Sequence, residues 1–227
     1  ALKPETADAR DRHLQTAQRS IDYIVRIVND ILDFSKIEAG AMTLEVIPFE
    51  LSEIMMRSQE MLTLPAEKAG LNLSVSIAPN TVDALLGDPY RLEQILINLV
   101  NNAIKFTPAG GLVEIRVKPL TDETCEDPYT VQFSVRDTGV GMSPEQQARL
   151  FQSYSQADNS IARQYGGTGL GLVVSQQLTQ LMGGEIWVES EKDVGSTFHF
   201  TANFGRPDPV ELAEQAVDKT TPETPRK

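Results

Sequence analysis

Residues 1–40 carry a regular spacing of apolar and polar side chains. From about Asp8 to Glu38, apolar or small residues recur at alternating steps of three and four. They are Leu14, Ala17, Ile21, Ile24, Val28, Ile31 and Ser35. This heptad spacing predicts one long amphipathic helix, and Ala39-Gly40 predicts its end. Such a helix either lies along its own domain or packs in a bundle or dimer. The strict spacing favours the second arrangement.

From about residue 43 to residue 204, short strand patterns alternate with longer helix patterns. Strands are predicted at Thr43–Pro48, Leu71–Ile77, Leu112–Val117, Thr130–Arg136, Glu185–Glu189 and Thr197–Asn203. Helices are predicted at Ser52–Ala69, Pro89–Lys105, Pro144–Gln152 and Leu170–Met182. Several strands follow one another through short turns rather than through helices. We therefore predict an α+β fold, with a mixed or largely antiparallel sheet and helices on one face.

The pattern divides the chain into three segments. Residues 1–40 form the predicted heptad helix, and residues 41–204 form the predicted α+β domain. Residues 205–227 are rich in Pro, Thr, Glu and Lys and hold no aromatic residue, which predicts a flexible linker or tail. Because the sequence starts at Ala1 without a methionine, we expect it to be part of a longer protein.

Composition and charge narrow the classes of partner. Hydrophobic residues make up 41% of the chain, which is enough for a buried core. The formal net charge of −12 argues against nucleic acid or direct contact with an anionic membrane, because phosphate groups attract clustered Lys and Arg. A single cysteine cannot form an internal disulfide. One cysteine and two histidines are also too few for the usual four Cys and His ligands of a structural zinc site. No apolar run approaches the ~18 residues of a membrane span.

The segment Arg91–Thr107 predicts a helix with a polar stripe on an otherwise apolar surface. Asn98, Asn102 and Lys105 recur at steps of four and three, so they share one helix face. An ordinary solvent-facing stripe is one interpretation. In the other, an Asn amide oxygen binds Mg²⁺, which prefers hard oxygen ligands, and the lysine meets a phosphate.

A carboxylate directly follows the predicted strand Thr130–Arg136. Asp137 is followed by Gly139 and Gly141, where the backbone can approach a ligand closely. An ionised Asp only accepts hydrogen bonds, so it suits the exocyclic amino group of adenine, where guanine presents a carbonyl oxygen. A tight turn without a ligand is the alternative.

Four glycines crowd the run Gly166–Leu172, at the start of the predicted helix Leu170–Met182. Glycines are costly there unless the backbone must approach a ligand, and amides at a helix N-terminus bind anions. The run matches neither the Walker pattern nor a dinucleotide fingerprint. We favour phosphate binding over a merely flexible loop.

The segment between these two motifs predicts a lid. Phe151 and Tyr154 are expected to anchor one end, and the polar run Gln156–Gln164 can close over a nucleotide. Its Arg163 is a candidate contact to the terminal phosphate, with an exposed loop arginine as the alternative. Downstream, Gly195–Phe198 predicts a β-turn feeding the last strand, and its Gly195 either touches the nucleotide pocket or is only structural.

Taken in order, these motifs resemble the N, G1, F, G2 and G3 boxes of sensor histidine kinases. The matching stretches are LINLVNNAIKFT, RDTGVG, LFQSYSQAD, YGGTGLGL and GSTF. Asn29–Gly40 is similar to the end of the dimerisation helix of hybrid sensor kinases, so the resemblance covers roughly Arg10 to Phe204. It implies a Bergerat-type α/β sandwich, shared with DNA gyrase and mismatch-repair ATPases.

The resemblance also implies roles for single residues. Asn102 would bind Mg²⁺, Lys105 would contact phosphate and Asp137 would contact the adenine of ATP. Asn98 would support the nucleotide site and take part in catalysis with Lys105 and Arg163. The remaining nucleotide contacts implied are Gly139, Gly141, Phe151, Gly167, Thr168, Gly169, Leu170, Gly171 and Thr197.

One family element is missing from the sequence. The H box is typically a histidine followed at once by an acidic residue. Neither His13 nor His199 has that context. We therefore expect the phosphoacceptor histidine to lie outside this chain, on a dimerisation domain reached in cis or in trans. The resemblance also implies a receiver domain as partner, a homodimer in the full-length protein and a cytoplasmic location, with a parent that can be membrane-anchored.

Other functions remain open. A catalytically silent module could bind nucleotide and act by heterodimerisation through the heptad helix. An ATPase is disfavoured because gyrase-like relatives place a water-activating Glu where this chain has Asn98, and an amide is no general base. A serine kinase of the anti-sigma type is disfavoured by the helix that ends in ILDFSKIEAG.

Overall fold

The computed structural model of the chain describes residues 7–120, 128–151 and 169–207. Its centre is a five-stranded sheet with the order β2-β4-β5-β7-β6. The strands are β2 (Asn72–Ile77), β4 (Leu112–Pro119), β5 (Tyr129–Asp137), β7 (Gly195–Phe204) and β6 (Ile186–Glu191). β2 and β4 are parallel and the other three pairs are antiparallel. The predicted mixed sheet is confirmed.

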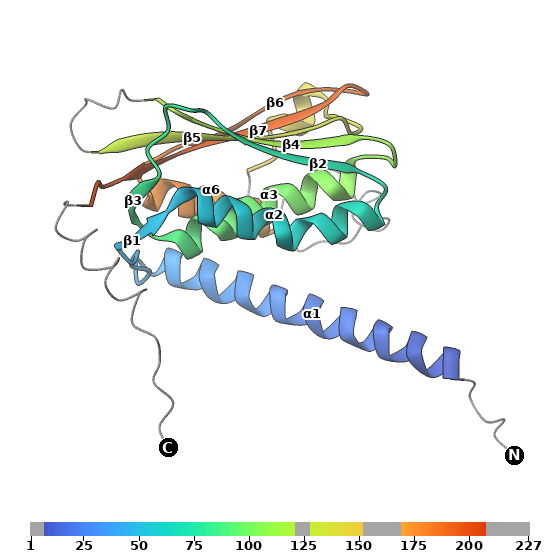
Figure 1. Cartoon of the computed structure of the whole chain (residues 1–227). Helices are drawn as coiled ribbons and strands as arrows, with labels where there is room; N and C mark the ends of the chain where they lie inside the picture. The colour runs from blue at the N-terminus through green and yellow to red at the C-terminus, as the bar shows by residue number, and fades with distance from the viewer. Residues whose placement is uncertain (1–6, 121–127, 152–168, 208–227) are drawn as a thin grey trace, which may run out of the picture.

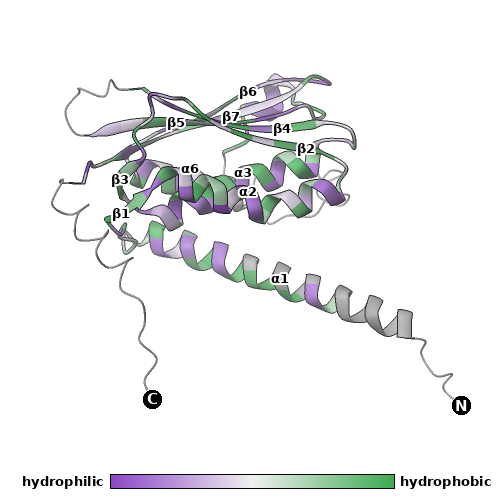
Figure 2. Ribbon diagram, in the orientation of Figure 1, coloured by the Kyte–Doolittle hydropathy of each residue, from purple (hydrophilic) through white to green (hydrophobic). Residues whose placement is uncertain are grey.

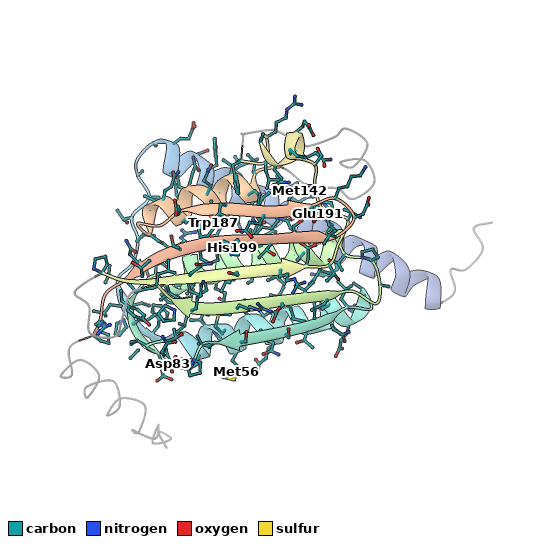
Figure 3. The ribbon with its side chains drawn as sticks, turned by 90° about the horizontal axis from the view of Figure 1, so that it is seen from above. Met56, Asp83, Met142, Trp187, Glu191 and His199 are labelled. Atoms are coloured by element: carbon teal, nitrogen blue, oxygen red, sulfur yellow. The ribbon has the colours of Figure 1, made fainter. Side chains whose placement is uncertain are left out.

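Three helices cover one face of this sheet: α2 (Leu51–Lys68), α3 (Pro89–Phe106) and α6 (Gly171–Leu181) (Figure 1). The core lies between them and the sheet, where the rings of Phe133 and Phe200 stack with centroids 4.7 Å apart. The opposite face is polar and open. Figure 3 looks onto it and shows Trp187 and His199 on the neighbouring strands β6 and β7.

Helix α3 forms where its capping and apolar spacing require it. Asp88 caps the N-terminus by accepting a hydrogen bond from the Arg91 N–H at 3.0 Å, and Pro89 occupies the first turn. After Pro89, the residues that α3 buries all lie on one face: Leu92, Ile95, Leu96, Leu99, Val100 and Ala103. The polar side chains of α3 are thereby directed away from the core.

A second sheet of two strands departs from the sequence prediction. The predicted strand Thr43–Pro48 is wrong in its bounds, because β1 is Ile47–Glu50 and Val46 is 71% exposed. β1 pairs antiparallel with β3 (Ala84–Gly87), which was not predicted. Each strand has four residues, too few for a period-2 pattern, and each depends on the other across the chain.

Two further boundaries differ from expectation. The helix predicted at Pro144–Gln152 is α4 (Pro144–Gln147), which begins with a capping box at Ser143. Gly205, assigned to the tail, exchanges two backbone hydrogen bonds with Leu86 and so extends the domain by one residue.

The predicted heptad helix is α1 (Ala7–Glu38), which runs away from the helix layer (Figure 1). Its C-terminal part contacts the domain: the Asp33 carboxylate accepts hydrogen bonds from Arg91 at 3.1 Å and Gln94 at 2.8 Å. Apolar residues recur along α1 (Figure 2). Those of them that are exposed are Ile21, Ile24, Val25, Val28, Ile31 and Leu32. Within the three ranges given above, no helix is long and apolar enough to cross a membrane.

Candidate functional site

Asp137 lies at the C-terminal end of β5 and is only 5% exposed. Its Oδ1 accepts hydrogen bonds from the N–H groups of Gly139 at 2.8 Å and Ser196 at 3.3 Å. Among residues with a described position, none donates to Oδ2. Burial raises the pKa of the Asp137 carboxyl, and the two amide donors oppose that rise. Asp137 Oδ2 is thereby left to accept from a ligand.

The loop of residues 137–141, the Asp137 loop, is fixed by backbone contacts on both sides. The Val140 N–H donates to the Phe106 carbonyl at the end of α3, and the Val140 carbonyl accepts from the Asp193 N–H. Gly141 has a φ of +59°, and a Cβ placed there would overlap the Glu191 carbonyl oxygen. Only glycine suits this position. The predicted close approach at Gly141 is therefore made to the protein's own β6–β7 turn.

The polar face of α3 lies half-buried beside α6. Asn98 Nδ2 donates to the Ser175 hydroxyl at 2.8 Å, and the Asn98 amide lies against Gly171, the first residue of α6. Asn102 follows one turn later. Lys105 is in the last turn, with its Nζ 4.7 Å from the centroid of the Phe106 ring. Asn98, the first residue of the predicted stripe, thus faces the start of the glycine-rich helix.

Helix α3 connects the two halves of the site. Its end contacts the Asp137 loop through Phe106, and its middle contacts α6 through Asn98. At a rise of 1.5 Å per residue, Phe106 and Asn98 lie about 12 Å apart along the helix axis. That separation is of the order of the length of a nucleotide.

The remaining predicted residues fall in several places. Gly169 has a φ of +70° and Leu170 is buried, so both lie where the glycine-rich run enters α6. Phe151 packs against the core. Arg163, Gly167 and Thr168, like the predicted lid that includes Arg163, lie outside the described residues.

Two residues of the site were not predicted. The backbone N–H of Ser196 donates to Asp137. Its neighbour Thr197 pairs with Arg136 and Glu189, and because side chains alternate along a strand, the Thr197 side chain lies on the outer face of the sheet. Ser175 holds Asn98. A serine four residues after Gly171 was the available signal, since those positions share a helix face.

A cavity of about 700 Å³ opens between α1, α3 and α6. Asn98, Gly171 and Ser175 line it from the side of the domain, and Asp33 and Lys36 line it from α1. Asn98 is therefore the member of the predicted stripe that borders this space, which a second molecule or segment can enter.

Comparison with known proteins identifies the family. The sequence model of histidine kinase-, DNA gyrase B-, and HSP90-like ATPases matches residues 87–206, just over half of the chain. The chain belongs to this ATPase family. A second model, of the His Kinase A (phospho-acceptor) domain, matches residues 1–40. The chain thus carries the ATP-binding domain of histidine kinases, and the predicted family and fold class are confirmed.

Named relatives agree with this assignment. Signal transduction histidine-protein kinase BarA of Escherichia coli (strain K12) is 42% identical over 203 residues, covering 89% of this chain and 22% of that protein. Sensor protein GacS of Pseudomonas syringae pv. syringae is 47% identical over 196 residues, covering 86% of this chain and 21% of that protein. This chain therefore spans about a fifth of the length of either relative.

A solved structure also resembles the chain along most of its length. The crystal structure of full-length ShkA in complex with AMPPNP matches with a TM-score of 0.72 and 31% identity. The match covers 90% of this chain and 41% of that one.

Proposed function

We propose that this chain is the catalytic part of a two-component histidine kinase, which binds ATP and donates its γ-phosphate to a histidine of a dimerisation domain. One observation carries the proposal. The buried Asp137 sits in a loop joined to α3, the helix that carries Asn98, Asn102 and Lys105 and whose Asn98 contacts α6 at Gly171 and Ser175. The ATPase family match and the kinase names of the relatives support it.

Asp137 is the proposed adenine contact. Oδ1 is already used by two backbone donors, so Oδ2 would accept from the exocyclic amino group. Guanine would present a carbonyl oxygen to that carboxylate and leave two buried acceptors facing each other, which is costly. The site is therefore proposed to select ATP over GTP.

Asn102 is the proposed Mg²⁺ ligand. Its amide oxygen is the hard donor that Mg²⁺ accepts, and Mg²⁺ at nucleotide sites keeps several waters and binds substrate phosphates. In the portion of the chain that the structure covers, no group of three or more His, Cys, Asp or Glu side chains gathers as a metal cage. When bound, the ion would neutralise charge on the triphosphate. Lys105 is the proposed phosphate contact, beside backbone amides at the start of α6.

The proposed reaction is in-line phosphoryl transfer. The bond from the γ-phosphorus to the bridging oxygen breaks, a bond to a neutral imidazole nitrogen forms and ADP leaves. Positioning and charge neutralisation supply most of the catalysis in such transfers. Because the amide of Asn98 cannot act as a general base, hydrolysis to water is proposed to be slow.

The accepting histidine is proposed to lie outside this chain. His199 is on the outer face of the sheet, away from the helices, with its ring stacked on Trp187 at 5.0 Å and its side chain 13% exposed. His13 lacks the sequence context of an H box. The exposed apolar stripe of α1 is proposed to pair with the rest of the dimerisation hairpin in a homodimer, as its match to the phosphoacceptor domain suggests.

Several finer assignments stay proposals from the resemblance. Arg163, Gly167 and Thr168 are proposed to contact phosphates, and Phe151 and Thr197 to border the nucleotide. A receiver domain is proposed as the next partner in the phosphorelay, in the cytoplasm.

Calorimetry with AMPPNP and Mg²⁺ tests the binding half of the proposal, and absence of binding would overturn it. Labelled ATP with a separately expressed phosphoacceptor hairpin then tests transfer. Phosphate on the hairpin histidine is the expected result. Nucleotide binding without any transfer would instead support the silent module that acts through heterodimerisation.

A further inference from the structure

Asn98 is held between two residues of α6 that lie one helical turn apart. Its Nδ2 donates to the Ser175 hydroxyl at 2.8 Å. Its Oδ1 lies so close to Gly171 that a Cβ placed there would overlap the oxygen, while Cγ and Nδ2 would lie 3.1 and 3.2 Å from that Cβ. Residues 171 and 175 share a helix face. We call Asn98, Gly171 and Ser175 the Asn98 clamp.

In the clamp, the nitrogen end of the amide faces Ser175 and the oxygen end faces Gly171. An amide has one acceptor oxygen and two N–H donors, and the two ends have nearly the same shape. Ser175 is 2% exposed and takes the nitrogen end, so the oxygen end lies at Gly171. Gly171 begins α6, where the helix dipole favours negative partial charge. The amide nitrogen therefore meets a hydrogen-bond acceptor at Ser175, and the amide oxygen meets the positive end of the α6 dipole at Gly171.

The clamp also borders the cavity between α1, α3 and α6, because all three of its residues line that space. Whatever enters the cavity near the start of α6 meets the Asn98 amide in a fixed orientation. Rotating the amide by half a turn would exchange donor and acceptor at that point. Recognition of phosphate oxygens, which only accept, depends on that difference.

We propose that Ser175 is a positioning residue for the triphosphate site, which holds the Asn98 amide in place and thereby raises the affinity for nucleotide. This inference rests on the proposed function, in which Asn98 supports the triphosphate. Without the Ser175 hydroxyl, Nδ2 loses its buried acceptor, and this hydrogen bond no longer holds the Asn98 side chain against α6.

A purely structural role makes a different prediction. If Ser175 only tied α3 to α6, its removal would lower thermal stability and leave nucleotide affinity as it was. Thr179 provides the matched control. It lies one turn further along α6, is 0% exposed, and its buried hydroxyl has no partner in the described parts of the chain. Thr179→Val removes a buried hydroxyl from the same helix without touching Asn98.

The test measures AMPPNP affinity with Mg²⁺ by calorimetry for the wild type, S175A, N98A, the double variant and T179V. We expect about a tenfold loss for S175A, no further loss when S175A is added to N98A, and wild-type affinity for T179V. Wild-type affinity for S175A, or an equal loss in the N98A background, would overturn the role of Ser175. If S175A does not fold, S175C replaces it, since a thiol keeps the volume but accepts weakly.

A second readout needs no nucleotide. In the nucleotide-free protein labelled with ¹⁵N-asparagine, the side-chain NH₂ signals of Asn98 are expected to shift and exchange faster in S175A, while T179V leaves them unchanged. Unchanged Asn98 signals in S175A would count against the clamp. Absence of AMPPNP binding by the wild type would overturn the proposed function itself, a result that these signals keep distinct from a failure of the clamp.

Discussion

The two ends of the site are held in place by different parts of the chain. Asp137 is positioned by main-chain donors, from Gly139 two residues away and from Ser196 on the neighbouring strand. Asn98 is positioned by a side chain, Ser175, 77 residues away along the chain, and by the missing side chain of Gly171. One end is built from backbone and the other from a pair of side chains.

This difference determines how each end can be damaged. A substitution cannot remove a backbone N–H other than by introducing proline, so the Asp137 end tolerates changes in its donors and is sensitive to Asp137 and its glycines. The Asn98 end has no such protection, because one substitution at Ser175 removes its hydrogen bond. Substitutions at each end, each paired with a matched control variant, therefore separate the two kinds of support.

The largest effect is expected for Asp137→Asn. The two backbone donors fix the new oxygen at the Oδ1 position, so the amide nitrogen replaces Oδ2 and meets the adenine amino group donor to donor. We expect about a hundredfold loss of ATP affinity by calorimetry, equal with and without Mg²⁺. Asp88→Asn is the control, since Asp88 is similarly buried but its two oxygens accept from the Arg91 and Glu45 N–H groups, and an amide can replace only one of these acceptors. It should lower stability and leave ATP affinity nearly unchanged, and a similar affinity loss in D88N would show that D137N acts through the fold.

The Gly141→Ala variant comes next and tests the backbone of the Asp137 loop. Gly141 and Gly110 both have positive φ, but a Cβ at Gly141 would overlap the Glu191 carbonyl whereas one at Gly110 has nothing within 4 Å. Gly110→Ala should cost about 1 kcal/mol of unfolding free energy in urea, and Gly141→Ala about 2–3 kcal/mol. Equal losses would show that the contact with β6 and β7 does not constrain the loop.

The same contrast explains what the sequence could and could not predict. The Asp137 end was predictable because Asp137, Gly139 and Gly141 are neighbours in sequence, and local geometry follows from local residues. Ser175 and Ser196 were missed because their partners, Asn98 and Asp137, are adjacent only after folding. The strand β3 was missed for the same reason, since its four residues are defined by pairing with β1.

The polar face of α3 is tested by Asn102→Ala. If its amide oxygen binds Mg²⁺, the variant should lose about tenfold in ATP affinity with Mg²⁺ present and nothing without it, unlike D137N. Asn101→Ala is the control, because Asn101 precedes it on α3 but points about 100° away around the helix. Calorimetry in EDTA and in Mg²⁺ separates the cases. An affinity loss in N102A that persists in EDTA would remove Asn102 from the metal site.

The smallest effect is the pH dependence of stability at the Asp137 end. Burial raises the pKa of Asp137 above 3.8, so the native state binds the proton more tightly than the unfolded chain. The stability that this proton contributes is fully present below the unfolded value and is lost as pH rises through the folded pKa. Relative to the wild type, D137N should therefore gain stability with rising pH and then level off.

Urea unfolding at a series of pH values from about 3 to about 7 checks this dependence, with S175A as the comparison. The Asn98 clamp contains no titratable group, so the difference between S175A and the wild type should stay flat over the same range. The change in stability with pH at Asp137 is expected to be small, because the Gly139 and Ser196 amides lower the pKa that burial raises. A flat difference for D137N would mean that these two donors cancel the burial, and a fall with rising pH would mean that they outweigh it. Either result would mean that the Gly139 and Ser196 amides stabilise the ionised Asp137 carboxylate at least as much as burial destabilises it.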